Sequence, residues 1–490
     1  MPPLKPRFAR LGDGFFEAVS GKALPDPVLI HFNDALADEL GLAHQVLGCE
    51  ALIGMLAGNS AWPGYAPIAS AYAGHQFGAW VPQLGDGRAL LIAEIATPAG
   101  ERREIQLKGS GPTPYSRGLD GRAVLRSSIR EYLCSEAMHH LGVSTTRCLS
   151  LIGSSEPVQR ETVETAAVVC RVSPSFVRFG SFEYFFHRRQ NEQLATLAEH
   201  VIEEHYPHLI GLPDRYARWL TEVVERTARL MAQWQSLGFC HGVMNTDNFS
   251  VLGLTLDYGP YGFMDRFRQH HVCNHSDYEG RYAYSAQPQV GQWNCSRLLR
   301  ACLPLLAEDT QAALEIGTGI FERYAPVYAQ AMMRRWADKL GLFEARESDT
   351  ELVNGLLSIL QRGKNDFTRS FRHLSRLEAL SDVPAAGIRE EITDLEAFDA
   401  WIVDYRARLR SEQNTDDAAR AERMNRVNPK YVLRNHLAQR AIEQAEQGDY
   451  AELAVLMSLF RRPYDEQPEL ESYAEEPPAD QCSIEVSCSS

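Results

Sequence analysis

The chain has 490 residues, which is long for one compact core, so we expect two lobes or two domains. Its 44% hydrophobic and 23% charged residues are typical of a globular protein. The formal net charge of −15 argues against non-specific binding to nucleic acids or anionic membranes, because both need a basic face. We therefore expect neither partner, although a few arginines could still line a nucleotide pocket.

Targeting signals are absent from the sequence pattern. The N-terminal stretch lacks the apolar core of a secretory signal, and no segment approaches the roughly 20 apolar residues of a membrane helix. Ten cysteines are scattered without a C-x-x-C pair, which argues against a zinc framework or a disulfide scaffold. These features predict a cytoplasmic protein with reduced thiols.

The first part of the chain reads as mixed strand and helix. Residues 88–95 and 103–109 are strand-like and are separated by "ATPAGE", which predicts a hairpin. Apolar residues recur at helical spacing over 122–141, which predicts a helix. A further strand is expected over 164–174, ending at a proline.

From about residue 190 the pattern is mainly helical. The stretch 216–239 is long and amphipathic, and Gly238 suits a helix stop. Two short strands are expected within 249–259. Further helical runs are predicted over 296–345, 350–377, 392–412 and 430–460.

The predicted elements divide the chain into three parts. We expect an N-terminal extension with a small mixed α/β lobe over 1–180 and a larger, mainly helical lobe over 181–462. After Arg462 no Lys or Arg appears, so 463–490 is expected to be an acidic, flexible tail. This order is that of an α+β, protein-kinase-like bilobal fold.

One motif between the predicted long helix and the next strands carries candidate chemistry. Protein kinases have H-R-D-x-x-x-x-N followed by D-F-G, and "HGVMNTDN" from His241 to Asn248, followed by Asp257-Tyr-Gly, keeps that order. Val243 stands where the kinase has its Asp. Asn248 and Asp257 are hard oxygen ligands suited to Mg²⁺ with phosphates, and Asp247 could face the acceptor. Alternatively, "NTDN" is ordinary turn chemistry.

A glycine-containing turn precedes the first predicted strand of the hairpin. In "QLGDGRA", Gly85 and Gly87 would let backbone amides approach phosphate oxygens, and Arg88 could contact a phosphate through its guanidinium. The turn departs from the kinase G-x-G-x-x-G pattern. A plain hairpin turn is the alternative reading.

Lys108 closes the second predicted strand, and Glu131 lies in the helix that follows. In kinases a strand lysine contacts phosphate and pairs with a helix glutamate. Asp120 and Gly121 lie in a turn between them. A solvated lysine at a strand edge is the alternative.

Two arginines follow in "CRVSPSFVRFGSFEYF". Arg171 ends the predicted strand and Arg178 lies seven residues later among aromatic residues. They could clamp a polyphosphate from separate segments. From spacing alone, surface arginines packed on Phe176 and Phe179 are the simpler reading.

Over most of its length the chain resembles the selenoprotein O family. The resemblance is carried by "YAGHQFGAWVPQLGDGRA", "QLKGSGPTPYSRGLDGRAVLRSSIREYL", "HGVMNTDNFSVLGLTLDYGPYGFMD", "NPKYVLRNHLAQRAIE" and the terminal "CSS". It implies a kinase-like fold that binds ATP inverted and transfers AMP to Ser, Thr or Tyr hydroxyls of proteins, releasing pyrophosphate. It further implies roles for named residues: Arg88, Arg171, Arg178 and Lys108 on the phosphates, Glu131 holding Lys108, Gly85, Gly87, Asp120, Gly121 and Asp257 as nucleotide contacts, Asn248 and Asp257 as metal ligands, and Asp247 as proton acceptor.

The resemblance also draws attention to two cysteines. Many eukaryotic members have selenocysteine at the position of Cys488, and Cys273 lies where a kinase keeps its activation loop. A disulfide between Cys273 and Cys488 could gate the site. Cys482 is a competing partner, and two unrelated thiols remain an equal alternative.

Other functions stay open at this stage. Ordinary phosphoryl transfer is disfavoured by Val243, and a silent pseudokinase scaffold is disfavoured by retention of Lys108, Glu131, Asn248 and Asp257. UTP with Mn²⁺ is an alternative to ATP with Mg²⁺. Self-modification is possible, while the protein targets are not encoded in any recognisable pattern.

Overall fold

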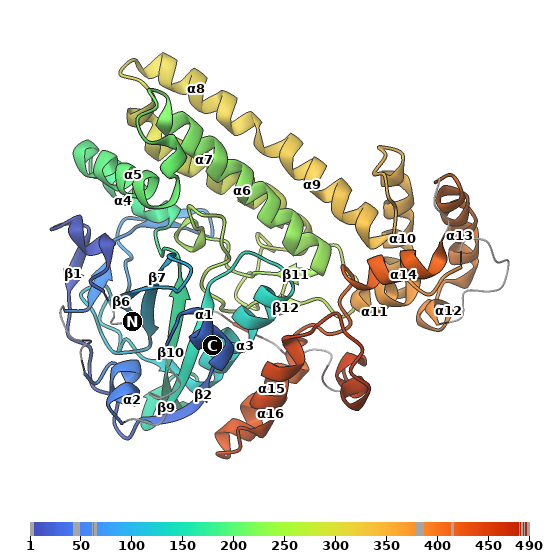
Figure 1. Ribbon diagram of the computed structural model, residues 1–490, viewed down its shortest axis with the longest axis horizontal. Coiled ribbons are helices and arrows are strands. Elements are labelled where there is room, and N and C mark those ends of the chain that lie inside the picture. Colours follow the sequence, from blue (N-terminus) through green and yellow to red (C-terminus); the bar gives the residue numbers. More distant parts are fainter. Residues whose placement is uncertain are drawn as a thin grey trace.

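The computed structural model describes residues 4–42, 50–60, 62, 66–378, 387–412, 416–479, 481, 484 and 486–487. Its strands gather in one region, and long helices cover another (Figure 1). The largest sheet has eight strands. Their order is β1 (Phe16–Ala18), β3 (Ile68–Ser70), β6 (Ala89–Ala96), β7 (Arg102–Lys108), β10 (Val163–Ser173), β9 (Arg147–Gln159) and β2 (Val28–Phe32), with β8 (Ala123–Val124) paired to β10.

The predicted hairpin is confirmed as β6 and β7, an antiparallel pair in which Ala89 lies opposite Lys108. β10 confirms the third predicted strand and lies antiparallel to β7, with Val169 opposite Lys108. Residues on both faces of β6 and β10 are buried, which explains their nearly continuous apolar runs. Lys108 therefore ends a strand at the centre of the sheet.

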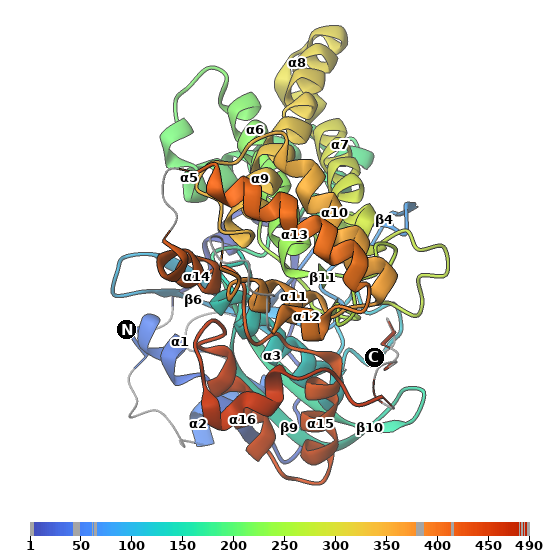
Figure 2. The same cartoon turned by 90° about the vertical axis from the view of Figure 1, so that its right-hand side faces the viewer.

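The helix predicted over 122–141 is α3 (Leu125–His140). One side of α3 packs on β9 and β10, and its other side meets α15 (Asn435–Glu446) and α16 (Ala451–Phe460). Figure 2 shows these C-terminal helices beside α3 and the sheet. Twelve of the sixteen α3 residues are buried, because the helix is enclosed on both sides.

The larger lobe is built from helices. The long predicted helix is α6 (Arg215–Leu237), which ends as expected at Gly238, whose φ of 67° is left-handed. Helix α6 contacts the three helices that follow it (Figure 1). The neighbouring helices are α4 (Phe179–His187), α5 (Asn191–His205), α7 (Gln287–Leu306), α8 (Thr310–Glu322) and α9 (Tyr324–Lys339).

A further group of helices has its own apolar core around Leu360, Phe371 and Tyr405. Its members are α10 (Asp349–Gly363), α11 (Phe367–Leu374), α12 (Ile388–Glu391), α13 (Leu395–Arg410) and α14 (Asp417–Asn425). Part of the acidic segment after Arg462 forms a 3-10 helix, Pro468–Ala474, whose Glu471 pairs with Lys430. The three-part division proposed from the sequence remains a prediction.

The prediction of two short strands within 249–259 is wrong. This segment forms single bridges only, between Phe249 and Thr255, and to the distant Arg178 and Thr145. Its backbone groups bond to other segments instead of to a regular ladder. The strands lie on either side of the motif, as β11 (Phe239–Cys240) paired with β12 (Gly262–Phe263).

An antiparallel sheet lobe joined to a larger helical lobe makes the fold kinase-like and bilobal, as predicted. Across the described ranges, no helix is both long enough and apolar enough to cross a membrane.

Candidate active site

Asp257 lies at the centre of a cluster of cations. Its Oδ2 is 2.6 Å from Nη1 of Arg178, and its Oδ1 contacts Nη1 of Arg171 and lies 3.7 Å from Nζ of Lys108. The backbone of Asp257 is left-handed, with φ of 54°, which is uncommon for a residue with a side chain. Strain of this kind persists where surrounding contacts hold the residue in place.

Glu131 connects two of these cations from the opposite side. Its Oε2 lies 2.5 Å from Nζ of Lys108, and its Oε1 lies 3.3 Å from Nη1 of Arg171. The three side chains come from α3, β7 and β10, which are neighbours because α3 packs on the sheet. Arg171 also donates to the side-chain oxygen of Gln106. The lysine–glutamate contact expected from the sequence is therefore present.

The charges of the cluster determine its protonation. Burial alone would raise the pKa of Asp257, but Arg178, Arg171 and Lys108 outweigh it and hold the pKa well below its usual range. Burial would lower the pKa of Arg178, yet Asp257 raises it above the ordinary value. Among the side chains in direct contact, three cations meet two carboxylates, Asp257 and Glu131, so these contacts leave one positive charge in excess. Such a site favours an anion such as a polyphosphate.

His241 supports the backbone that leads to Asp257. The amide N–H of Val243 lies 3.3 Å from Nδ1 of His241, so Nδ1 accepts and Nε2 carries the proton. Nε2 then donates to the main-chain oxygen of Leu256 at 2.8 Å. The ring stacks on Trp234, and burial lowers its pKa. His241 is thus a neutral imidazole that links the main chain at Val243 to the main chain at Leu256.

Asp247 is a buried acid next to this cluster, with 7% of its surface exposed. Its Oδ2 accepts from Nε2 of Gln76 at 3.2 Å, while its Oδ1 has no hydrogen-bond partner among the described residues. Burial raises the pKa of Asp247 to about 7, against the opposing effects of Gln76 and Arg178. The main-chain oxygen of Asp247 accepts from Nη1 of Arg178 at 2.9 Å. The carboxylate is therefore suited to take a proton from a ligand.

Asn248 is only half-buried, and its Nδ2 donates to the main-chain oxygen of Val243 at 3.0 Å. That bond leaves Oδ1 as an oxygen donor. Within the described ranges, no group of three or more His, Cys, Asp or Glu side chains could hold a metal ion. A metal held by Asn248 and Asp257 would need further oxygen ligands from a bound molecule.

The glycine turn before β6 packs tightly on residues 113–116. A Cβ on Gly85, whose φ is 86°, would overlap the ring of Tyr115, and one on Gly87 would lie 2.9 Å from the Tyr115 oxygen. The side chain of Asp86 is buried and accepts from the amide of Ser70 at 3.0 Å. Packing against Tyr115 is therefore sufficient reason for glycine at both positions.

Other predicted site residues lie outside the set of side chains that pair with Asp257. Arg88 is exposed beside the glycine turn, and its charge still interacts with those of Glu131 and Asp257. Asp120 pairs with Arg160 at 2.7 Å, and the carbonyl oxygen of Gly121 accepts from the amide of Gly111 at 3.2 Å. The contacts of the 120–121 turn thus run to other parts of the sheet lobe.

A short hairpin, β4 (Gly74–Gln76) and β5 (Ala79–Val81), supplies residues that sequence reasoning missed. Besides Gln76, it contributes His75, whose amide donates to Oγ1 of Thr246 at 2.7 Å. Nδ1 of His75 lies 2.6 Å from Glu183 in α4. In "GHQFGAWV", the two glycines that flank His75, Gln76 and Phe77 are the sequence signal for this hairpin.

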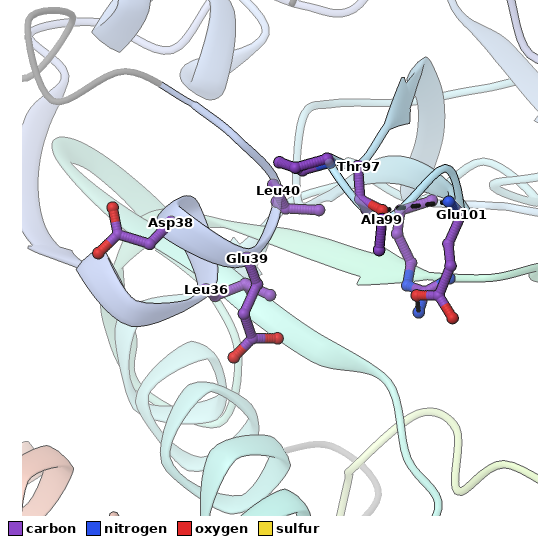
Figure 3. Close-up of a pocket in the computed structure, with 9 residues that line it drawn as sticks. Leu36, Asp38, Glu39, Leu40, Thr97, Ala99 and Glu101 are labelled. Atoms are coloured by element: carbon purple, nitrogen blue, oxygen red, sulfur yellow. Dashed lines mark hydrogen bonds and ion pairs between the residues drawn. The ribbon is translucent and has the colours of Figure 1, made fainter.

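A separate pocket of about 390 Å³ lies on the sheet lobe (Figure 3). It is lined by α1 (Asp34–Glu39) and by the β6–β7 turn, including Thr97 and Glu101. That turn is at the far end of β7 from Lys108, roughly 15–20 Å away at about 3.3 Å per residue. The pocket is therefore distinct from the Asp257 cluster.

Cys273 lies near Gly242 of the His241–Asn248 motif, and its Sγ donates to the Pro260 oxygen at 3.0 Å. The amide of His275 donates to the oxygen of Val486 at 2.8 Å, so the C-terminal segment reaches the residues directly after Cys273. Cys482 and Cys488 lie outside the described residues. The pairing of Cys273 with Cys488 stays a prediction.

Two lobes, and an acid of the larger lobe that is contacted by three cations from the first 180 residues, define the class. It is a kinase-like nucleotide-dependent transferase. A sequence model of the family described as protein adenylyltransferase SelO matches residues 3–461. The chain belongs to this nucleotidyltransferase family.

Similar proteins named protein nucleotidyltransferase YdiU occur in several bacteria. That of Methylococcus capsulatus is 69% identical over 488 residues, covering 100% of this chain and 96% of the relative. That of Burkholderia thailandensis is 52% identical over 498 residues, covering 99% and 95%. That of Paraburkholderia xenovorans is 52% identical over 492 residues, again covering 99% and 95%.

Proposed function

We propose that this chain moves AMP from ATP to the hydroxyl of Ser, Thr or Tyr side chains of proteins. The observation that carries the proposal is Asp247, a buried carboxylate with one oxygen bonded to Gln76 and the other without a partner in the described ranges. Arg178 connects the Asp247 loop to the cation-lined Asp257. A proton acceptor beside a phosphate-binding cluster is what transfer to a hydroxyl requires.

In the proposed reaction, ATP is inverted relative to a kinase, so that its α-phosphorus faces the acceptor. The hydroxyl oxygen attacks the α-phosphorus while its proton passes to Asp247. The bond from the α-phosphorus to the bridging oxygen breaks, and pyrophosphate leaves. The β- and γ-phosphates are stabilised by Lys108, held by Glu131, and by Arg88, Arg171 and Arg178, with Gly85, Gly87, Asp120 and Gly121 as further nucleotide contacts.

We assign a divalent metal ion, Mg²⁺, to Asn248 and Asp257. Both offer hard oxygen atoms, which Mg²⁺ prefers. Asp257 already contacts three cations, so a metal fits beside it only together with phosphate oxygens to which those cations can turn. When bound, the ion would neutralise phosphate charge.

The position of the label in ATP tests the proposal. The protein is incubated with Mg²⁺ and either [α-³²P]ATP or [γ-³²P]ATP, and incorporation into itself and into casein is followed. Label from the α position alone is the expected result. Label from γ alone would indicate phosphoryl transfer, and none from either would favour a silent scaffold.

Two variants and a second nucleotide complete the experiment. Asp257→Ala should abolish labelling, and Asp247→Asn should reduce it by on the order of 100-fold or more. Labelling that survives Asp257→Ala would reject the metal assignment. A parallel reaction with [α-³²P]UTP and Mn²⁺ decides between AMP and UMP as the transferred group.

A further inference from the structure

The β4–β5 hairpin lies across the loop that carries Asp247. Three consecutive hairpin residues donate to three consecutive loop residues that are about 170 positions away in the sequence. These bonds are His75 N–H to Thr246 Oγ1 at 2.7 Å, Gln76 Nε2 to Asp247 Oδ2 at 3.2 Å, and Phe77 N–H to Asn245 Oδ1 at 3.2 Å. Each of the three loop residues therefore accepts a hydrogen bond from the hairpin.

Close backbone packing brings the hairpin to this position. A Cβ on Gly74 would lie 2.7 Å from Oδ1 of Asp247, too close for any larger residue without movement. At the start of α4, a Cβ on Gly180 would overlap the main-chain oxygen of Ala73. The amide of Ala73 donates to the Gly180 oxygen at 3.1 Å. Only glycine at both positions permits this approach.

The hairpin turn is held in a costly conformation. Its two loop residues, Phe77 and Gly78, have φ of 48° and 83°, the arrangement of a type I′ turn. Phe is unfavourable at such a φ, by on the order of 1 kcal/mol or more. The Phe77 amide also donates to the hydroxyl of Tyr282 at 2.9 Å, and Tyr282 donates to Asn245. Contacts with the Asp247 loop therefore compensate for the strain.

From this geometry we propose that Gln76 is a positioning residue for Asp247. Its amide holds Oδ2 while Gly74 packs against the buried Oδ1, so the hairpin fixes the orientation of the carboxylate. The amide is a donor without a charge, so it fixes Oδ2 without forming an ion pair. A glutamate would place two carboxylates together. This inference rests on the proposed function, in which Asp247 takes the hydroxyl proton.

Three variants test the role. Gln76→Ala removes the donor, and Gln76→Glu keeps the shape but replaces the donor with a carboxylate. Gln439→Ala is the matched control, because Nε2 of Gln439 donates to Glu443 at 2.9 Å on an exposed helix face. The rate of self-labelling from [α-³²P]ATP with Mg²⁺ is measured across ATP concentrations, together with the Tm of each variant.

We expect the maximal labelling rate to fall while the apparent affinity for ATP stays nearly the same. Both Gln76 variants should lower the maximal labelling rate by on the order of 10- to 100-fold, since a misplaced catalytic group costs about that much. The half-saturating ATP concentration should stay within about twofold of the wild-type value, and Tm should match that of Gln439→Ala.

Two outcomes would overturn the inference. One is a wild-type labelling rate in Gln76→Ala and Gln76→Glu. The other is a loss of rate accompanied by a proportional rise in the half-saturating ATP concentration, which would indicate a disturbed nucleotide pocket. A wild-type protein that incorporates no α label would instead reject the proposed function, and this inference with it.

Discussion

Nη1 of Arg178 lies 2.6 Å from Oδ2 of Asp257, and both side chains are largely enclosed by the two lobes. The same nitrogen donates to the main-chain oxygen of Asp247. One guanidinium therefore connects the proposed metal ligand to the proposed proton acceptor. A buried charge of this kind is stable only while its partners remain.

Removing the shared acid should destabilise the fold. In Asp257→Ala, Lys108, Arg171 and Arg178 lose a carboxylate that all three contact, so we expect the free energy of unfolding to fall by about 3 kcal/mol. Urea unfolding measures the change. Glu422→Ala, which breaks an exposed helical pair with Arg426, is the control and should cost less than about 0.5 kcal/mol. Equal effects in the two variants would contradict the ion-pair account.

A methyl group at Gly85 should disrupt the glycine turn. Gly85→Ala combines an unfavourable φ of 86° with overlap onto the Tyr115 ring. Gly100→Ala has nearly the same φ, 83°, but nothing within 4 Å of the added Cβ, so it isolates the cost of the backbone. We expect about 1 kcal/mol for Gly100→Ala and at least about 2 kcal/mol more for Gly85→Ala. Thermal or urea unfolding of both variants checks the difference.

Lys339 should make stability depend on pH. Its side chain is 3% exposed, with Nζ 4.2 Å from the ring centre of Phe371, and burial lowers its pKa to about 7. The unfolded chain, with a pKa near 10.5, binds a proton that the folded protein releases above pH 7. The free energy of unfolding attributable to Lys339 therefore rises from pH 7 towards pH 10 and is flat below pH 7.

Lys339→Met removes this dependence. At pH 7 the variant should be more stable than the wild type by on the order of 2–4 kcal/mol, and the gap should narrow at pH 9. Lys5→Met, at an exposed lysine, should leave the pH dependence unchanged. Urea unfolding at both pH values measures the difference in free energy of unfolding between the variant and the wild type. A difference that is the same at pH 7 and pH 9 would show that Lys339 is charged in the folded state.

Cys273 is predicted to respond to reductant. Val486, two residues before Cys488, pairs with the segment directly after Cys273, which favours a disulfide between these cysteines. Oxidised wild type should show altered mobility on a non-reducing gel and lower labelling activity, both reversed by reductant. Cys273→Ser and Cys488→Ser should abolish the response, while Cys482→Ser should retain it. A response that disappears only in Cys482→Ser would favour the competing pair.

The elements that the sequence predicted are those with a local signal. Helix 216–239 and the strands around "ATPAGE" were found because apolar periodicity and turn residues act over a few positions. The strands expected within 249–259 failed because that segment bonds to Arg178 and Thr145, far along the chain. The family resemblance added candidate roles that no local pattern contains.

Residue identity and order along the chain determined the candidate acids and cations, since Lys108, Glu131 and Asp257 stand where a kinase-like site needs them. Only the tertiary structure decided that Asp257 is shared by three cations and that Gln76 holds Asp247. These contacts join residues between 79 and 171 positions apart. Such contacts form because sheet, helix and hairpin pack around one centre, and nothing in the local sequence specifies that packing.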